Sequence, residues 1–376
     1  MLDREKRLDK ALEKFVEDKE IPGGALRVRK SGKLVYERCV GYGDIEKKIP
    51  VRADTIYRMC SMTKLLTAVC AMQLVERGNM SLDDNLGKWF PDFRDDLKKI
   101  TVRHLLNHSC GIGQGPKSAA YYEKHCVSGD TLAERVNRWR NMPLDFPVGS
   151  SPAYSPVIAF DLLGRIIEIT GGEPLQSYME QNLFKPLEME DSTFHLSREQ
   201  RKRKALLYEK EENGLREVAD ERAVKELSSV YDSGCGGVYS TLRDYDHFTE
   251  MLAAGGCRRG RRVIGEKSLR LMRTTGQITD RELRPGCRWG LGFLVVENPE
   301  LAGRAVGKGT FGWSGAYGTH MYVDPVNDIS VTFLTGRRDI GGADSPVSRA
   351  LEELIFPDRS SGKPSAAHRS RQKSPR

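Results

Sequence analysis

The stretch that decides the fold is RMCSMTKLLTAVC, residues 58–70, which places Ser61 and Lys64 three residues apart at the start of a predicted helix. Residues at this spacing share one helical face and can touch. Ser61 would stand in the first turn, where free N–H groups and the positive end of the helix dipole favour an attacking oxygen. The methionines and leucine around Lys64 can desolvate its amine, which favours the neutral, basic form. A serine needs such an adjacent base to act as a nucleophile.

The spacing alone is not specific, because S-x-x-K recurs at Ser360/Lys363 and at Ser370/Lys373 in a polar tail. That tail, residues 358–376, carries six basic residues against one acid and has almost nothing to bury, so it is predicted to be disordered. It holds five of the eight net positive charges of the chain. The basic balance therefore does not indicate nucleic acid as a partner.

Length and cysteine usage restrict the class of protein. A chain of 376 residues can bury one large core or two smaller ones, and no run of 18 apolar residues predicts a transmembrane segment. The first twenty residues are charged throughout, lack the apolar core of a signal peptide and read as an amphipathic helix. The eight cysteines are scattered without a C-x-x-C pair. We expect reduced thiols, no metal, no cofactor and a cytoplasmic location.

The order of predicted elements indicates an α+β protein. Strands are expected in a hairpin over 23–44, in a second hairpin over 204–220 that turns at Asn213-Gly214, and over 289–297, 305–325 and 329–337. Helices are expected over 55–79, 101–109, 131–142, 156–171, 242–256 and 345–356. Tight turns between the strands predict an antiparallel sheet flanked by helices. The predicted domains are 1–75 plus 228–356 for the sheet, 76–227 for an inserted, mostly helical part with a hairpin, and 357–376 for the tail.

Three short motifs do not support other chemistries. GIGQGPKS, residues 111–118, fails the phosphate-loop pattern because Pro116 precedes Lys117 and no apolar strand leads into it. HLLNH would place His104 and His108 on one helical face, but Leu105 replaces the glutamate of a zinc-binding H-E-x-x-H, so packing or hydrogen-bonding histidines are expected. GWSGAYG, residues 312–318, misses the second glycine of a G-x-S-x-G nucleophile elbow.

Several segments in one order give Ser61 and Lys64 a context. LLNHSCGIG, then FPVGSSPAYSPVIAFDLLGRIIEITGG, then DSGCGGVYSTLRDYDHFTEML and finally GTFGWSGAYGTHMYVDP follow the S-x-x-K. Together they resemble the serine β-lactamase-related family, which includes class C β-lactamases, D-alanyl-D-alanine carboxypeptidases, serine esterases and certain acyltransferases. The resemblance covers about 8–356 and implies a β-lactamase/transpeptidase-like fold.

The resemblance implies roles for particular residues. Ser61 matches the acylated nucleophile, Lys64 its partner, and Tyr154 the tyrosine of the family's Y-x-N motif, which shares the proton transfers. Gly315 and Ala316 match the strand of the family's K-T-G region, so the amides of Ser61 and Ala316 would form the oxyanion hole. Trp313, Ser314 and Gly315 would line the substrate, and a glycine on that strand lets a substrate lie close.

Two departures from the family pattern narrow the chemistry. Pro156 replaces the asparagine of Y-x-N, and Trp313 replaces the lysine or histidine of K-T-G. A proline has no N–H to donate and an indole carries no charge, although amide substrates with a carboxylate need both. The resemblance therefore predicts a serine hydrolase of the esterase-like branch, a carboxylesterase or acyltransferase on small neutral esters or thioesters. The alternatives are an amide hydrolase of the β-lactamase or carboxypeptidase type, and a catalytically silent homologue that binds a ligand.

Overall fold

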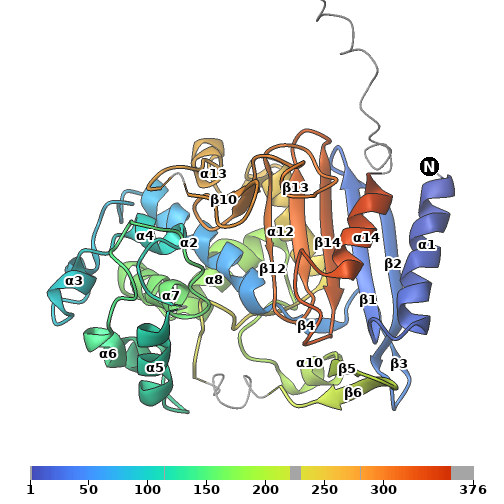
Figure 1. Cartoon of the computed structure of the whole chain (residues 1–376), viewed down its shortest axis with the longest axis horizontal. Coiled ribbons are helices and arrows are strands. Elements are labelled where there is room, and N and C mark those ends of the chain that lie inside the picture. Colours follow the sequence, from blue (N-terminus) through green and yellow to red (C-terminus); the bar gives the residue numbers. More distant parts are fainter. Residues whose placement is uncertain (1, 114, 221–229, 280, 357–376) are drawn as a thin grey trace, which may run out of the picture.

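One eight-stranded antiparallel sheet organises the molecule (Figure 1). The computed structural model describes residues 2–113, 115–220, 230–279 and 281–356. In spatial order the strands are β10 (Cys287–Trp289), β11 (Leu294–Val296), β12 (Thr310–Ser314), β13 (His320–Asp324), β14 (Ile329–Thr335), β1 (Gly23–Lys30), β2 (Lys33–Asp44) and β3 (Ile49–Pro50). The two ends of the chain meet where β14 pairs with β1. The predicted antiparallel sheet is confirmed.

Helices cover both faces of this sheet (Figure 1). On one face lie α1 (Leu2–Glu17) and α14 (Pro346–Ile355); on the other lie α12 (Leu242–Ala253) and, beyond it, α2 (Thr63–Glu76). Successive side chains of β1 point to opposite faces of the sheet and so contribute to both cores. Leu26 joins the core under α1 and α14, whereas Ala25 joins the core of α2 and α12. The predicted α+β class is confirmed.

Short helices and turns fill the chain between β4 (Ile56–Arg58) and β7 (Tyr239–Thr241). They are α3 (Asp95–Lys98), α4 (Val102–Leu106), α5 (Pro116–His125), α6 (Leu132–Arg138), α7 (Ile158–Gly171), α8 (Leu175–Met179), α9 (Lys185–Leu187) and α10 (Arg198–Lys202), followed by the hairpin β5 (Leu207–Glu211) and β6 (Gly214–Val218). Beyond β7 and α12 come β8 (Cys257–Arg258), β9 (Arg261–Arg262) and α13 (Glu266–Met272). Helix α7 packs on α2, α4, α6 and α8 and is the centre of this part. The predicted domain boundaries stay a prediction.

Turn chemistry explains where several elements begin and end. The β1–β2 hairpin closes through Ser31 and Gly32, both with positive φ, as its sequence predicts. Helix α7 ends before Gly172, whose φ is 76°. The β5–β6 hairpin exists, but Glu211 pairs with Gly214, so the connection lies one residue earlier than predicted.

Four predicted elements are corrected by the structure. The helix expected over 55–79 begins only at Thr63, because Ile56–Arg58 form strand β4 and Cys60–Met62 a 3₁₀ turn. The single strand expected over 305–325 is two strands, β12 and β13, paired with each other. The helix expected over 101–109 spans only Val102–Leu106, and His108 adopts a left-handed φ of 58°, so it shares no helical face with His104. The single strand expected over 289–297 is two strands, β10 and β11, paired with each other. Gly292, with a φ of 86°, lets the chain reverse there.

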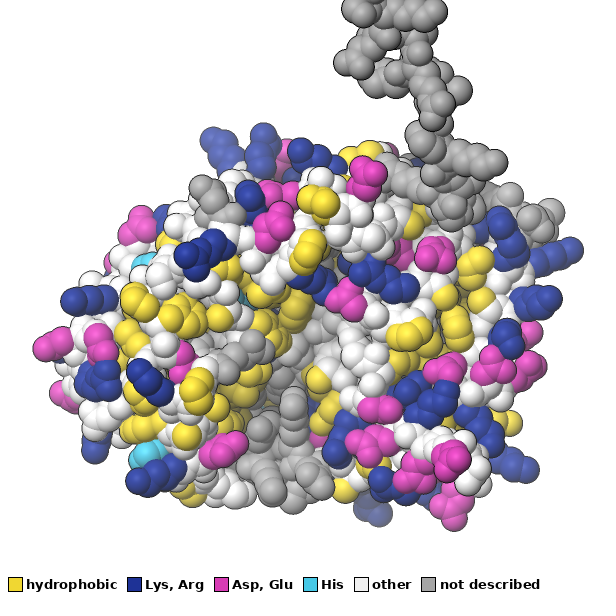
Figure 2. All heavy atoms as spheres, viewed as in Figure 1, with side chains coloured by type: hydrophobic (Ala, Val, Ile, Leu, Met, Phe, Trp, Pro, Cys, Tyr) yellow, Lys and Arg dark blue, Asp and Glu magenta, His cyan; other side chains and the backbone are white. Residues whose placement is uncertain are grey.

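The surface and the cysteines complete the description. Lys and Arg side chains are interspersed with Asp and Glu over the face in Figure 2 rather than gathered in one patch. All eight cysteines are free thiols. Among the residues described, none of the helices combines the length and the apolarity needed to cross a lipid bilayer.

Candidate active site

Ser61 lies at a strained junction between a strand and a helix. Strand β4 ends at Arg58, a 3₁₀ turn spans Cys60–Met62, and α2 begins at Thr63. The φ of Cys60 is 48°, a left-handed conformation that costs energy for a residue with a side chain. Two contacts hold the preceding Met59: its N–H donates to the Val238 carbonyl at 2.9 Å, and its own carbonyl accepts from a threonine hydroxyl on the β12–β13 turn. Ser61 therefore lies in the 3₁₀ turn that leads directly into α2.

Lys64 is buried and points at Ser61. Only 1% of the residue is exposed, and its Nζ donates to Ser61 Oγ at 3.2 Å, to the Pro156 carbonyl at 2.7 Å and to the Cys235 carbonyl at 2.8 Å. The two carbonyls can only accept, so they take two N–H groups of Lys64 and leave its third position to the Ser61 hydroxyl, which can accept or donate. The Nζ also lies 5.2 Å from the centre of the Tyr154 ring, within the range of a cation–π contact. The site thus fixes the Lys64 amine next to the serine and the tyrosine.

Tyr154 completes the cluster around Ser61 Oγ. Its hydroxyl lies 2.6 Å from that oxygen, and the Trp313 Nε1–H donates to the same hydroxyl at 3.3 Å. The ring of Trp313 is 5.1 Å from that of Tyr154 and 4.7 Å from that of Trp289. The structure therefore brings Ser61 and Lys64, which share one segment, together with Tyr154 and Trp313 from two others.

His108 holds the tyrosine segment from behind. Its Nδ1 accepts the Ser155 N–H at 3.1 Å, and its ring lies 4.9 Å from that of Tyr154. Burial, and then the charge of Lys64, lower the pKa of His108 well below its ordinary value, so the ring is neutral and can accept this bond. Sequence reasoning expected a structural histidine here without locating its partner.

The turn after β12 packs against the residues that precede Ser61. Gly315 donates to the Thr319 carbonyl at 2.8 Å, and a Cβ added to it would lie 2.2 Å from Thr319 Oγ1 and 2.3 Å from the Met59 carbonyl oxygen. Only glycine fits this approach. Ala316 packs against the small cluster that contains Cys60. Within the part of the chain that the structure describes, the Ala316 amide forms no hydrogen bond, so it is available to an oxyanion.

The Ser314 side chain points away from the face of β12 on which Trp313 contacts the site. Its hydroxyl bonds His320 Nδ1 at 2.8 Å, and a Cβ on Gly342 would meet the Ser314 Cβ at 2.3 Å, so this side chain is covered. Successive residues of a strand point to opposite faces, and Trp313 takes the face of the site. The Ser314 side chain is thus not gathered with the other predicted site residues, and the alternation of the strand is the signal that could have shown it.

Sequence reasoning missed the acceptors of Lys64. The Pro156 and Cys235 carbonyls are backbone groups 92 and 171 residues away from it in the chain. No residue type marks them, so only their position next to Tyr154 and within the glycine-rich 234–237 stretch could have drawn attention to them.

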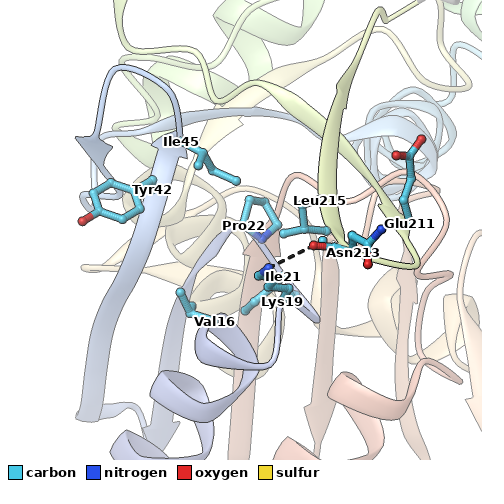
Figure 3. A pocket seen from close by; sticks show the side chains of 10 residues that line it. Val16, Lys19, Ile21, Pro22, Tyr42, Ile45, Glu211, Asn213 and Leu215 are labelled. Carbon is cyan, nitrogen blue, oxygen red and sulfur yellow. Dashed lines mark hydrogen bonds between the residues drawn. The ribbon is translucent and has the colours of Figure 1, made fainter.

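A separate surface pocket lies at the end of α1. Its volume is about 480 Å³, and apolar side chains such as Val16, Tyr42 and Leu215 line it (Figure 3). The Lys19 amine donates to the Asn213 carbonyl at 3.0 Å across it. None of its lining residues contacts Ser61, so we do not assign it to the reaction.

Comparisons with known proteins agree with this geometry. The family model described as Beta-lactamase matches residues 8–352. Esterase EstB of Burkholderia gladioli is 29% identical over 93% of this chain and 94% of its own length, and Protein Rv1367c of Mycobacterium tuberculosis (strain ATCC 25618 / H37Rv) is 30% identical over 84% and 85%. The solved structure of EstCE1, a hydrolase with promiscuous acyltransferase activity, shares the fold with a TM-score of 0.84 at 24% identity, covering 93% of this chain and 98% of that one. The chain therefore belongs to the beta-lactamase family.

Proposed function

We propose that this serine hydrolase forms an acyl-enzyme on Ser61 and acts as a carboxylesterase or acyltransferase on small neutral esters or thioesters. The observation that carries the proposal is the position of Ser61 Oγ, which lies 2.6 Å from the Tyr154 hydroxyl and 3.2 Å from Lys64 Nζ. A nucleophile within hydrogen-bond reach of two groups that can exchange its proton is the arrangement acyl transfer needs. The relation to Esterase EstB over nearly the whole chain supports esters as the substrate class.

The proposed reaction has two steps. Ser61 Oγ attacks the ester carbonyl while Lys64, as the neutral amine, takes up its proton and becomes an ammonium. The carbonyl oxygen becomes an oxyanion held by the amides of Ser61 and Ala316. Collapse expels the alkoxide, which takes the proton of the Tyr154 hydroxyl, and leaves the acyl group on Ser61. The Lys64 ammonium then returns a proton to the Tyr154 oxygen. Water or an acceptor alcohol then gives its proton to the same pair, attacks the acyl-enzyme and releases the acid or a new ester.

The surroundings of the pair support a neutral substrate. Lys64 is committed to Ser61 and to two backbone carbonyls, so it is not available to a substrate carboxylate. At Trp313, where the family's amide hydrolases present a cation, an indole N–H contacts Tyr154 instead. Among the described residues no further Lys or Arg bonds the side chains of Ser61, Tyr154 or Trp313. The contacts of these three side chains thus supply no counter-charge for a substrate carboxylate.

The partners follow from this chemistry. A small ester or acyl donor is the proposed ligand, and the interspersed charges in Figure 2 do not favour nucleic acid. A cytoplasmic location is proposed on the free thiols.

The test compares wild type with Ser61→Ala on p-nitrophenyl esters of graded chain length, on nitrocefin and with a fluorophosphonate probe. Ser370→Ala, in the same S-x-x-K spacing, is the matched control and should leave turnover and labelling unchanged. We expect ester turnover and labelling that depend on Ser61. Nitrocefin turnover far above ester turnover would favour the amide hydrolase, and absence of both would indicate a silent homologue.

A further inference from the structure

A second charged group lies buried behind the site, on the far side of the Cys235 peptide. Asp161 belongs to the first turn of α7 and is fully buried. Its carboxylate accepts the Cys235 N–H at 3.0 Å, the Ser233 hydroxyl at 3.0 Å and the Tyr231 hydroxyl. A buried carboxylate is costly unless its oxygens are hydrogen-bonded, and these donors all come from one loop. Asp161 therefore fixes that loop to α7.

The loop in turn contacts Lys64. The N–H of Cys235 goes to Asp161, and the carbonyl of the same residue accepts from Lys64 Nζ at 2.8 Å. The carbonyl of the preceding residue, Gly234, accepts from the Thr67 hydroxyl on α2 at 2.7 Å. The 234–235 segment is thus held on one side by α7 and on the other by the helix that carries Lys64.

Close packing leaves this segment little freedom to move. A Cβ on Gly234 would lie 2.5 Å from the Phe160 carbonyl oxygen and 3.3 Å from the Gly164 Cα, so the backbones of loop and helix are in direct contact. A group attached to α7 can therefore set the position of the Cys235 carbonyl to within the tolerance of a hydrogen bond.

The pKa of Asp161 is raised above its ordinary value, with burial as the largest cause. Burial raises the pKa of Asp161, whereas its three hydrogen-bond donors and the positive charge of Arg135 oppose the rise. Arg135 is itself buried on α6, with its guanidinium carbon 4.1 Å from the centre of the Tyr231 ring. The charge of Arg135 acts on Asp161 across the Tyr231 ring, whose hydroxyl donates to the same carboxylate.

We propose that Asp161 is a positioning residue, which holds the Cys235 carbonyl against Lys64 and so keeps the Lys64 amine directed at Ser61. The proposal rests on the proposed function, because it assigns to Lys64 the proton transfer of acylation. Asp161 does not touch the substrate. Its effect should appear in the rate of acylation and only where Lys64 is present.

The test measures acylation of Ser61 by a fluorophosphonate probe and steady-state turnover of a p-nitrophenyl ester. Asp161→Ala should slow acylation roughly 10- to 30-fold, the range for loss of one hydrogen bond to a charged group, with KM little changed. Asp161→Asn keeps an oxygen for the Cys235 N–H and should recover most of the rate. In a Lys64→Ala background the Asp161→Ala change should have no further effect, since the two act as one unit.

Asp244→Ala is the matched control. Asp244 is also buried and accepts a backbone N–H and the Ser192 hydroxyl, but it contacts none of the site residues. An equal loss of acylation in this control, or additive effects of Asp161→Ala and Lys64→Ala, would overturn the proposal. Absence of Ser61 labelling in wild type would instead overturn the proposed function.

If Asp161→Ala does not fold, two milder variants test the proposal instead. Tyr231→Phe and Ser233→Ala each delete one hydroxyl that donates to Asp161. Slower acylation that disappears without Lys64 supports the positioning role, and unchanged acylation in both variants refutes it.

Discussion

Replacing Trp313 with phenylalanine tests whether its indole N–H assists the tyrosine. The variant keeps an aromatic ring against Tyr154 and Trp289 but loses the donor that lies 3.3 Å from the Tyr154 hydroxyl. If the Tyr154 hydroxyl gives its proton to the leaving alkoxide, negative charge develops on the phenol oxygen in the transition state, and a donor aimed at it lowers the barrier.

The size of the effect follows from the geometry. A hydrogen bond to a charged group contributes about 1.5–3 kcal/mol, and a separation of 3.3 Å is longer than the usual 2.9–3.0 Å, so the lower end applies. About 1.5 kcal/mol corresponds to a roughly tenfold change in rate. We therefore expect Trp313→Phe to lower kcat/KM on a small p-nitrophenyl ester by about tenfold.

Trp289→Phe is the matched control. Trp289 lies 4.5 Å from the His108 ring and 4.7 Å from Trp313, yet within the described chain its buried Nε1–H has no hydrogen-bond partner. Its replacement should change kcat/KM by less than about threefold, because no hydrogen bond is lost. Equal losses in the two variants would mean that ring packing, not the N–H, explains the effect. No loss in Trp313→Phe would refute the role of the indole.

Two other predictions concern the turn beside the site and the response to acid. Gly315→Ala should lower ester turnover more than tenfold and reduce the midpoint of thermal unfolding. The reason is that the new Cβ would lie 2.2 Å from Thr319 Oγ1 and 2.3 Å from the Met59 carbonyl oxygen. Turnover equal to that of wild type would contradict this close approach. Burial, with the charge of Arg304, lowers the pKa of His320 to about 3. Below its ordinary value of 6.5 the unfolded chain binds a proton that the native state does not, so stability falls by about 1.4 kcal/mol per pH unit. The free energy of unfolding, measured in urea at pH 7, 6 and 5, should fall less steeply with decreasing pH in His320→Asn than in wild type. Equal pH dependence in the two proteins would refute the role of His320.

Local features of the sequence were enough for much of the fold. Ser31 and Gly32 specify the β1–β2 turn, and Gly172 ends α7, because the conformations involved depend on the residues themselves. The strand over 289–297 was predicted wrongly, since a pattern of apolar residues does not reveal that Gly292 reverses the chain. Periodicity reports burial, and both arrangements bury the same side chains.

For Ser61 and Lys64, too, one part of the arrangement follows from the sequence and another part only from the tertiary structure. Its spacing places serine and lysine on one helical turn, which the sequence by itself determines. What surrounds the lysine depends on folding: two carbonyls, of Pro156 and Cys235, and behind the second the carboxylate of Asp161. Every residue has a backbone carbonyl, so no sequence pattern identifies the two that lie within 2.8 Å of an amine. Only the packing of α2 against α7 and the 231–237 loop selects them.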